Sequence, residues 1–216
     1  MSTFIKSIHD ETLLQVHISC PLTKSNVPAI IIAHPYGPLG GNMNNNVVIA
    51  MQRHFVSKGY ITACLNFRGC GKSQGRTSWT GQGERADYMS VMNYLLDKYP
   101  NINQLVLSGY SYGAMIANSI ECTKVPCAYL LVSLPLGVMW ALATTKMNEF
   151  KKQPISHATL CIHGDHDQFT RASTFLNWCQ GHSNITHICI EGADHFWYDH
   201  EPELIDQINH WSLNIL

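Results

Sequence analysis

Residues 109–113 read Gly-Tyr-Ser-Tyr-Gly, which gives Ser111 the sequence surroundings of a nucleophile. The motif follows the apolar run 105–107 and precedes the small-residue segment 114–117, so a strand, the motif and a helix are predicted in the required order. Glycines two residues before and after Ser111 remove side chains that would collide in a sharp strand-to-helix turn. A motif this short also arises by chance, and the order of elements is what favours the functional interpretation. We therefore expect the Ser111 hydroxyl to project above a sheet, beside the positive N-terminus of a helix.

A serine nucleophile needs a base within hydrogen-bonding reach, and the base needs an acid that fixes its tautomer and stabilises its charged form. Two polar loops supply candidates. His-Gly-Asp-His-Asp follows the predicted strand 158–162, and Glu-Gly-Ala-Asp-His-Phe follows the predicted strand 185–190. Because parallel strands end at one edge of a sheet, we predict that Asp167 and His195 meet Ser111 there, in the chain order of α/β-hydrolases.

Neighbouring residues in these loops compete for the same roles. Asp165 is the alternative acid. Asp167 is favoured because the chain needs room after the strand before a carboxylate can turn back towards the histidine. We expect Asp194 and His163 to shape their loops rather than to take part in chemistry.

Length and composition narrow the class of protein. The 216 residues contain no long polar or Pro/Gly/Ser-rich stretch, which predicts a single domain over 1–216. Charged residues make up 13% of the chain and the formal net charge is −1, so nothing favours binding to nucleic acid or to an anionic membrane. Residues 1–11 have no apolar signal region, and no apolar run approaches the roughly 18 residues of a membrane span. We expect a soluble, cytoplasmic protein.

No metal or cofactor is expected. Despite twelve histidines and eight cysteines, the sequence contains no C-x-x-C and no H-E-x-x-H. The glycine-rich loop 68–75 lacks the glycine spacing of a phosphate-binding loop and of a dinucleotide-binding loop. Cys64, Cys127, Cys161 and Cys189 lie in apolar runs that we predict to be central strands, where free thiols act as small hydrophobic groups.

The hydrophobic pattern alternates between strands and helices, which predicts an α/β fold. Two strands at 4–9 and 13–19 would form an N-terminal β-ribbon. The strands 29–33, 60–67, 105–107, 128–133, 158–162 and 185–190 would form a mostly parallel sheet. Helices on both of its faces are predicted around 48–55, 88–99, 114–122, 169–179 and 204–215.

Four motifs together resemble one family. They are H-P-x-x-x-x-G-G at 34–41, N-F-R-G-x-G-x-S-x-G at 66–75, G-x-S-x-G at 109–113 and G-A-D-H-F at 192–196. In this order they resemble the small, lidless α/β-hydrolases of the dienelactone-hydrolase-like superfamily, in the branch with a serine nucleophile. The resemblance covers about residues 29 to 200.

The resemblance implies a role for each site residue. Ser111 would be the nucleophile, Asp167 the acid and His195 the base. Backbone N–H groups of Tyr112 and Tyr36 would form the oxyanion hole, since a proline directly before Tyr36 has no N–H to offer.

Two features of the chain qualify the resemblance. Residues 169–170 are Phe-Thr where similar proteins usually have Val-Pro, which leaves the course of that loop open. Relatives named for dienelactone hydrolysis use a cysteine nucleophile, so Ser111 favours ester chemistry in general.

By the same resemblance, the loop of Arg68 would lie beside the site and brace it, and Arg68 would take no catalytic step.

These observations favour a serine hydrolase that cleaves a small carboxylic ester or thioester through an acyl-enzyme intermediate. Lids in this fold are usually inserted after the sixth strand of the main sheet. In this chain the corresponding segment, 135–157, has 23 residues, which are too few for a cap domain. Val138, Met139, Trp140 and Leu142 in that segment, foremost Met139 and Trp140, would line an acyl pocket, or merely pack a helix onto the sheet. The expected partner is a small-molecule acyl substrate.

Two other classes of function remain open. A non-catalytic binding or scaffold protein could use the same fold, because fold alone does not establish function. A small peptidase or amidase is the second alternative. Peptidases of the prolyl-oligopeptidase kind share this core but normally carry a large additional domain, which these residues do not provide.

Overall fold

An eight-stranded sheet forms the centre of the molecule, of which the computed structural model describes residues 2–21, 26–143, 150 and 157–215. The strand order is β1-β2-β4-β3-β5-β6-β7-β8. β1 pairs antiparallel with β2 and β2 with β4, whereas all other neighbours pair in parallel, which confirms the predicted ribbon and mostly parallel sheet. The strands are β1 (Ser2–Lys6), β2 (Leu13–Ser19), β3 (Val27–Ala33), β4 (Ile61–Leu65), β5 (Ile102–Tyr110), β6 (Cys127–Val132), β7 (Thr159–Gly164) and β8 (Ile185–Ile190).

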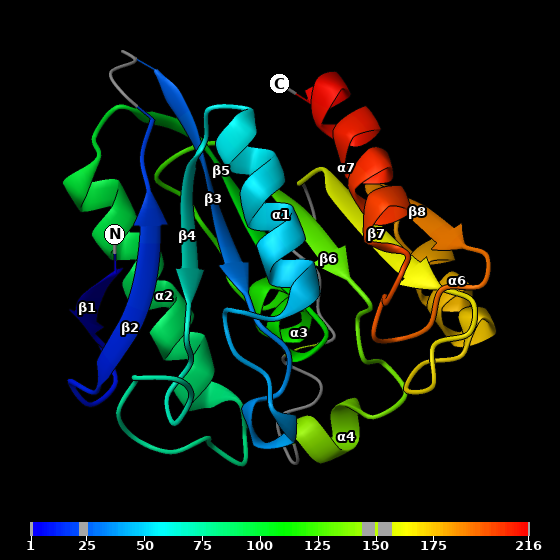
Figure 1. Cartoon of the computed structure of the whole chain (residues 1–216), viewed down its shortest axis with the longest axis horizontal. Coiled ribbons are helices and arrows are strands. Elements are labelled where there is room, and N and C mark those ends of the chain that lie inside the picture. The colour runs from blue at the N-terminus through cyan, green and yellow to red at the C-terminus, as the bar shows by residue number, and fades with distance from the viewer. Residues whose placement is uncertain (1, 22–25, 144–149, 151–156, 216) are drawn as a thin grey trace.

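Helices cover both faces of the sheet (Figure 1). α1 (Asn46–Ser57) and α7 (Glu201–Ile215) pack on one face. α2 (Gln82–Lys98), α3 (Tyr112–Asn118) and α6 (Ala172–Gln180) pack on the other. Strands β4, β6 and β7 are buried at every position, which explains why their sequences are continuous apolar runs rather than alternating ones.

The loops that follow the parallel strands gather at the carboxyl edge of the sheet. The short 3-10 helix η1 (Gly37–Leu39) follows β3, and α4 (Met139–Leu142) follows β6 at the edge to which the strand arrows point in Figure 1. The three predicted catalytic side chains follow β5, β7 and β8. Connectivity alone therefore delivers them to one edge, as expected for an open parallel sheet.

The boundaries of several elements differ from the prediction. β1 ends at Lys6 instead of residue 9, and α3 ends at Asn118 instead of near residue 122. α6 begins at Ala172 instead of Phe169, because the backbone N–H groups of Phe169 and Thr170 are bound by a carboxylate oxygen of Asp167 and so form a turn. α2 begins at Gln82, six residues before the predicted start of that helix at residue 88. The buried Glu84, whose carboxylate accepts hydrogen bonds from Ser78, explains why a polar first turn is stable there.

The prediction that Cys189 lies in a central strand is wrong. β8 is the last strand of the sheet, and Cys189 is exposed. Cys64, Cys127 and Cys161 are buried as predicted, and all eight cysteines are free thiols.

The segment 135–157 contains α4, and its positions 144–149 and 151–156 lie outside the described residues. None of the helices in the described ranges combines the length and the apolar character needed to cross a membrane.

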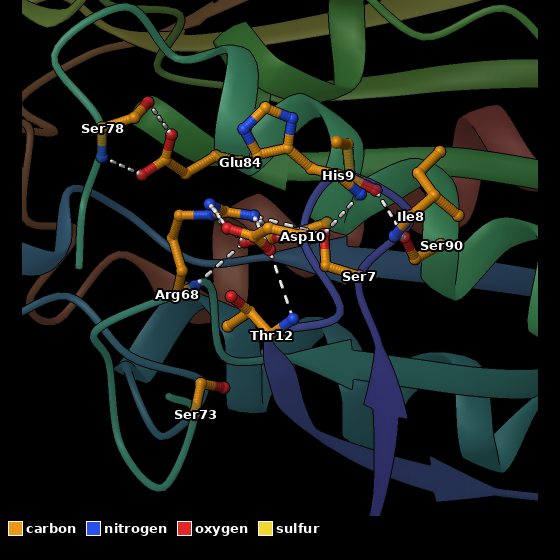
Figure 2. A network of polar contacts seen from close by, with 12 residues as sticks. Ser7, Ile8, His9, Asp10, Thr12, Arg68, Ser73, Ser78, Glu84 and Ser90 are labelled. Atoms are coloured by element: carbon orange, nitrogen blue, oxygen red, sulfur yellow. Dashed lines mark hydrogen bonds and ion pairs between the residues drawn. The ribbon is translucent and has the colours of Figure 1, made fainter. Parts of the chain in front are cut away.

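A buried arginine ties the N-terminal ribbon to α2 (Figure 2). The guanidinium of Arg68 donates to both carboxylate oxygens of Asp87, at 3.0 and 2.7 Å. It also donates to Asp10 at 3.0 Å and to the Ser7 hydroxyl at 3.2 Å, both in the β1–β2 turn. Arg68 therefore links α2 to the ribbon turn, because its guanidinium is paired with Asp87 in the one and with Asp10 in the other.

Arg68→Met is expected to lower the free energy of unfolding by about 3–5 kcal/mol. The substitution leaves the Asp87 carboxylate, whose side chain is 0% exposed, without its guanidinium partner. Urea denaturation followed by circular dichroism measures the change.

Two further variants control this prediction. Arg68→Met/Asp87→Asn should recover part of the loss, because asparagine removes the buried charge and keeps an acceptor for the backbone N–H of residue 68. Lys6→Met breaks the exposed Lys6–Glu11 ion pair and should cost less than about 1 kcal/mol. Equal losses for Arg68→Met and Lys6→Met would contradict the stabilising role of the network.

Candidate active site

The turn at Ser111 is enforced by close packing of α3 against the sheet. Ser111 lies between the last residue of β5 and the first residue of α3, with φ 55° and ψ −117°. A Cβ atom on Gly109 would lie 2.2 Å from the carbonyl carbon of Gly113, and one on Gly113 would lie 2.3 Å from the carbonyl oxygen of Ala33. Both motif glycines are required because the backbones touch, and the turn forces the serine into a strained conformation.

Ser111, His195 and Asp167 lie in one hydrogen-bonded chain. His195 Nε2 is 2.9 Å from Ser111 Oγ, and His195 Nδ1 is 2.6 Å from Asp167 Oδ2. All three residues are at most 7% exposed. Because an ionised carboxylate only accepts hydrogen bonds, Nδ1 carries the proton and Nε2 presents its lone pair to the serine hydroxyl. The structure thus brings together the three residues that the sequence predicts as a triad.

Asp167 is held as a carboxylate. Burial raises its pKa, but the hydrogen bond from His195, together with the backbone N–H of Thr170, leaves the pKa below its ordinary value. Asp165, the alternative acid, instead accepts a hydrogen bond from the backbone N–H of Gly192 at 2.8 Å. Only Asp167 of the two makes a hydrogen bond to His195.

Asp194 and His163 support the loops, as predicted. One carboxylate oxygen of Asp194 accepts the backbone N–H groups of Phe196 and Trp197, at 2.8 and 3.0 Å. His163 Nε2 bonds to the carbonyl of Thr170 at 2.8 Å, and burial lowers the pKa of His163. Because a carbonyl only accepts hydrogen bonds, Nε2 of His163 carries the proton, and the lowered pKa favours the neutral ring.

Further contacts fix the backbone of His195 itself. The side-chain oxygen of Gln168 accepts its N–H at 3.1 Å, and the hydroxyl of Tyr110 donates to its carbonyl. Sequence reasoning missed both residues. Each is adjacent to a predicted site residue in the chain, Gln168 to Asp167 and Tyr110 to Ser111, and this adjacency is the signal that could have identified them.

A buried histidine holds the loop that carries Tyr36. His34 Nδ1 bonds to the carbonyl of Pro35 at 2.6 Å, and His34 Nε2 accepts the backbone N–H of Phe67 at 3.0 Å. Nδ1 is therefore the donor, and both ring nitrogens are satisfied in the neutral form. Burial lowers the pKa of His34 to about 4.

The two predicted oxyanion donors flank Ser111. Tyr112 is the first residue of α3, where backbone N–H groups lack intrahelical acceptors. Tyr36 lines the cavity at Ser111, and its ring packs edge-on against that of Tyr112 at 5.2 Å between centroids. Whether their N–H groups bind an oxyanion stays a prediction.

A cavity of about 250 Å³ opens at Ser111 and His195. The polar side chain of Asn45 also faces it, but most of its wall is apolar. The apolar and aromatic lining side chains outside the predicted site are Pro35, Leu39, Tyr110, Val138, Leu142, Phe169, Phe196 and Tyr198.

Of the four pocket candidates in segment 135–157, two line the cavity, and the two that were put foremost do not. Met139 is fully buried in the core and Trp140 is 66% exposed, and neither lines the cavity. Their neighbours Val138 and Leu142 line it, because residues four apart share a helix face whereas Met139 and Trp140 point elsewhere.

The loop at residues 169–170 contains a feature that the sequence analysis missed. Phe169 stands where similar proteins usually have valine, and its ring packs edge-on against the imidazole of His195 at 4.5 Å between centroids. The departure from the family pattern therefore marks a side chain in direct contact with the predicted base. Across the described residues, no group of three or more His, Cys, Asp or Glu side chains is placed to hold a metal ion.

The fold is that of an α/β serine hydrolase. An α/β serine hydrolase homologue from Coxiella burnetii is 26% identical, with a TM-score of 0.83 over 100% of this chain and 97% of that one. A serine hydrolase from Xanthomonas campestris, described as without a lid, superposes with a TM-score of 0.81 at 23% identity, over 97% of this chain and 92% of that one. The resemblance to lidless α/β-hydrolases is thereby confirmed.

The family is defined more narrowly by the sequence. Residues 10–145 match the family model described as X-Pro dipeptidyl-peptidase (S15 family), and the chain belongs to that family. An uncharacterized protein from Rickettsia prowazekii is 29% identical over 205 residues, which is 89% of this chain and 82% of the relative.

The free energy of unfolding is expected to fall as the pH drops from about 6.5 to about 4. The pKa of His34 is about 4 in the folded protein against 6.5 for an ordinary histidine, so the unfolded chain binds a proton first as the pH falls. Above pH 6.5, His34 is neutral in both states and does not lower the free energy of unfolding. By pH 4, protonation of His34 in the unfolded chain lowers the free energy of unfolding by about 3 kcal/mol. Urea denaturation at a series of pH values measures it.

The matched variant is His34→Gln, which cannot titrate. Its stability should be lower at pH 7.5 and should depend less on pH than that of the wild type. Other histidines contribute equally to both proteins, so the difference between the two pH curves isolates His34. If the stability of both proteins changed equally with pH, the lowered pKa of His34 would be contradicted.

Proposed function

We propose that this serine hydrolase cleaves small, uncharged carboxylic esters or thioesters through an acyl-enzyme on Ser111. The observation that carries the proposal is the hydrogen-bonded chain from Asp167 through His195 to Ser111, which opens into an apolar cavity. A buried serine in such a chain is a nucleophile with its base and the partner of the base in place.

The proposed reaction has two steps. As Ser111 Oγ attacks the carbonyl carbon, His195 Nε2 takes its proton, and Asp167 stabilises the imidazolium that forms. The tetrahedral anion accepts hydrogen bonds from the backbone N–H groups of Tyr112 and Tyr36, and its collapse expels the alcohol with the proton held by His195. Water then attacks the acyl-enzyme with the same base, and Ser111 is restored. These steps use only water and the side-chain and backbone groups of this chain.

The lining of the cavity favours esters over peptides. A dipeptidyl-peptidase must accept a substrate with a charged α-ammonium group, and a buried ammonium needs a carboxylate beside it. Among the residues described as lining the cavity there is no aspartate, glutamate, lysine or arginine. A neutral substrate therefore suits this site better than the free N-terminus of a peptide.

The volume of the cavity supports a small acyl group. At about 250 Å³ it lies below the range of roughly 300–1,000 Å³ that is usual for sites of drug-sized ligands. Short-chain p-nitrophenyl esters should be better substrates than the octanoate, and a panel of X-Pro amides tests the peptidase alternative.

Ser111→Ala is expected to abolish labelling by a fluorophosphonate probe and to lower kcat/KM for p-nitrophenyl butyrate by at least about 10⁴-fold. Ser119→Ala, at the end of the same helix, is the matched control and should retain both properties because its hydroxyl donates to the carbonyl of Ile116 and does not bond to His195. If the wild type neither labels nor turns over, a non-catalytic binding protein becomes the better explanation.

Asp167→Asn and Asp165→Asn distinguish the two candidate acids. Asp167→Asn should lower kcat by about 10⁴-fold, because an amide favours the wrong tautomer of His195. Asp165→Asn should change kcat by less than a few-fold, since its side chain bonds to a loop N–H that an amide oxygen also satisfies. Steady-state kinetics on p-nitrophenyl butyrate gives both values, and equal effects would contradict the assignment of the acid.

A further inference from the structure

Aromatic side chains crowd the predicted base on the side of the cavity. The rings of Phe169 and Phe196 both approach the imidazole of His195 edge-on, at 4.5 and 5.8 Å between centroids. Tyr198 extends this group outwards, because its ring is nearly parallel to that of Phe196 at 6.3 Å, with 17° between the planes. We call Phe169, Phe196 and Tyr198 the aromatic wall.

The aromatic wall is open to solvent and to the cavity. Phe196 is 44% exposed and Tyr198 is 69% exposed, although both line the cavity. Neighbouring apolar groups left exposed beside a reactive centre are typical of a binding surface. Among the other side chains that line the cavity, Leu39 of η1 and Val138 and Leu142 at α4 are aliphatic. The two further aromatic residues are Tyr36, directly before η1, and Tyr110, whose ring lies on the side of His195.

The aromatic wall is also held in place before any substrate binds. Asn46 donates to the carbonyl of Phe196 at 2.9 Å and to a carboxylate oxygen of Glu201 at 2.7 Å, which joins the loop to the starts of α1 and α7. Asp194 binds the backbone N–H of Phe196 from the other side. A surface fixed in this way loses little conformational freedom on binding.

The chemistry of the site places the alcohol group of an ester substrate beside the aromatic wall. The base must return its proton to the departing oxygen, so that oxygen comes within hydrogen-bonding distance of His195 Nε2. The group attached to the departing oxygen therefore lies beside the rings that contact His195. The acyl group, on the other side of the carbonyl carbon, is left to the aliphatic side chains.

We propose that the site selects esters with a flat aromatic alcohol and a short aliphatic acyl group. This inference rests on the proposed function, because it assumes attack by Ser111 and proton return by His195. Flat rings stack on or meet the edges of aromatic side chains more favourably than saturated rings of similar size do.

Three esters test the inference with matched chemistry. Benzyl butyrate and cyclohexylmethyl butyrate have the same acyl group and a primary alcohol of similar size, and differ in the aromaticity of the ring. Propyl phenylacetate is an isomer of benzyl butyrate with the aromatic ring moved to the acyl side. We expect wild-type kcat/KM to be about tenfold higher for benzyl butyrate than for either of the other two.

The variant Phe196→Leu/Tyr198→Leu should reduce this preference to less than about twofold while its thermal unfolding stays close to that of the wild type. Trp140→Leu is the control, because Trp140 is similarly exposed but does not line the cavity, and it should keep the full preference.

The outcomes separate the two proposals. If all three esters are hydrolysed at similar rates and Ser111→Ala abolishes the activity, the proposed function holds and the aromatic-alcohol inference is overturned. A preference for propyl phenylacetate, or a preference that survives in the double variant, overturns it as well. If no ester is hydrolysed and the fluorophosphonate probe does not label Ser111, both proposals fail.

Discussion

The close contact between α3 and the sheet is the constraint on which the site depends. Gly113 rests on the carbonyl of Ala33 at a distance that admits no Cβ atom, and the same packing holds Ser111 at φ 55°. Without this approach the helix would start farther from β3, and the Ser111 hydroxyl would not lie within hydrogen-bonding distance of His195 in the loop after β8. The strain at Ser111 is stabilised by the buried core on both sides of the sheet.

Much of this arrangement could be predicted from the sequence, because it follows from local rules. Continuous apolar runs identify strands covered on both faces, and the glycines around Ser111 require a tight turn that few other residues permit. The pairing of His195 with Asp167 was predictable from chain order, since the polar loops after parallel strands share one edge.

The features that were mispredicted depend on tertiary context. The sequence of β8 resembles that of an inner strand, but only the sheet order shows that Cys189 lies at an edge. The apolar residues of segment 135–157 are similar in type, so which of them faces the cavity depends on the phase of α4. Phe169 occupies a helical pattern, yet a carboxylate captures its N–H and turns its ring towards the base.

Two buried histidines have opposite roles: His195 is placed to exchange a proton, and His34 holds loops together in its neutral form. The group that faces Nε2 of each ring determines which role it has. Nε2 of His195 faces a hydroxyl, a group that can both give and accept a proton. Nε2 of His34 faces a backbone N–H, which can only donate, so protonation there would place two donors head to head. His34 therefore links the loops after β3 and β4 through hydrogen bonds that need its neutral form. It holds the loop of Tyr36 in place and stays neutral while His195 gains and loses a proton.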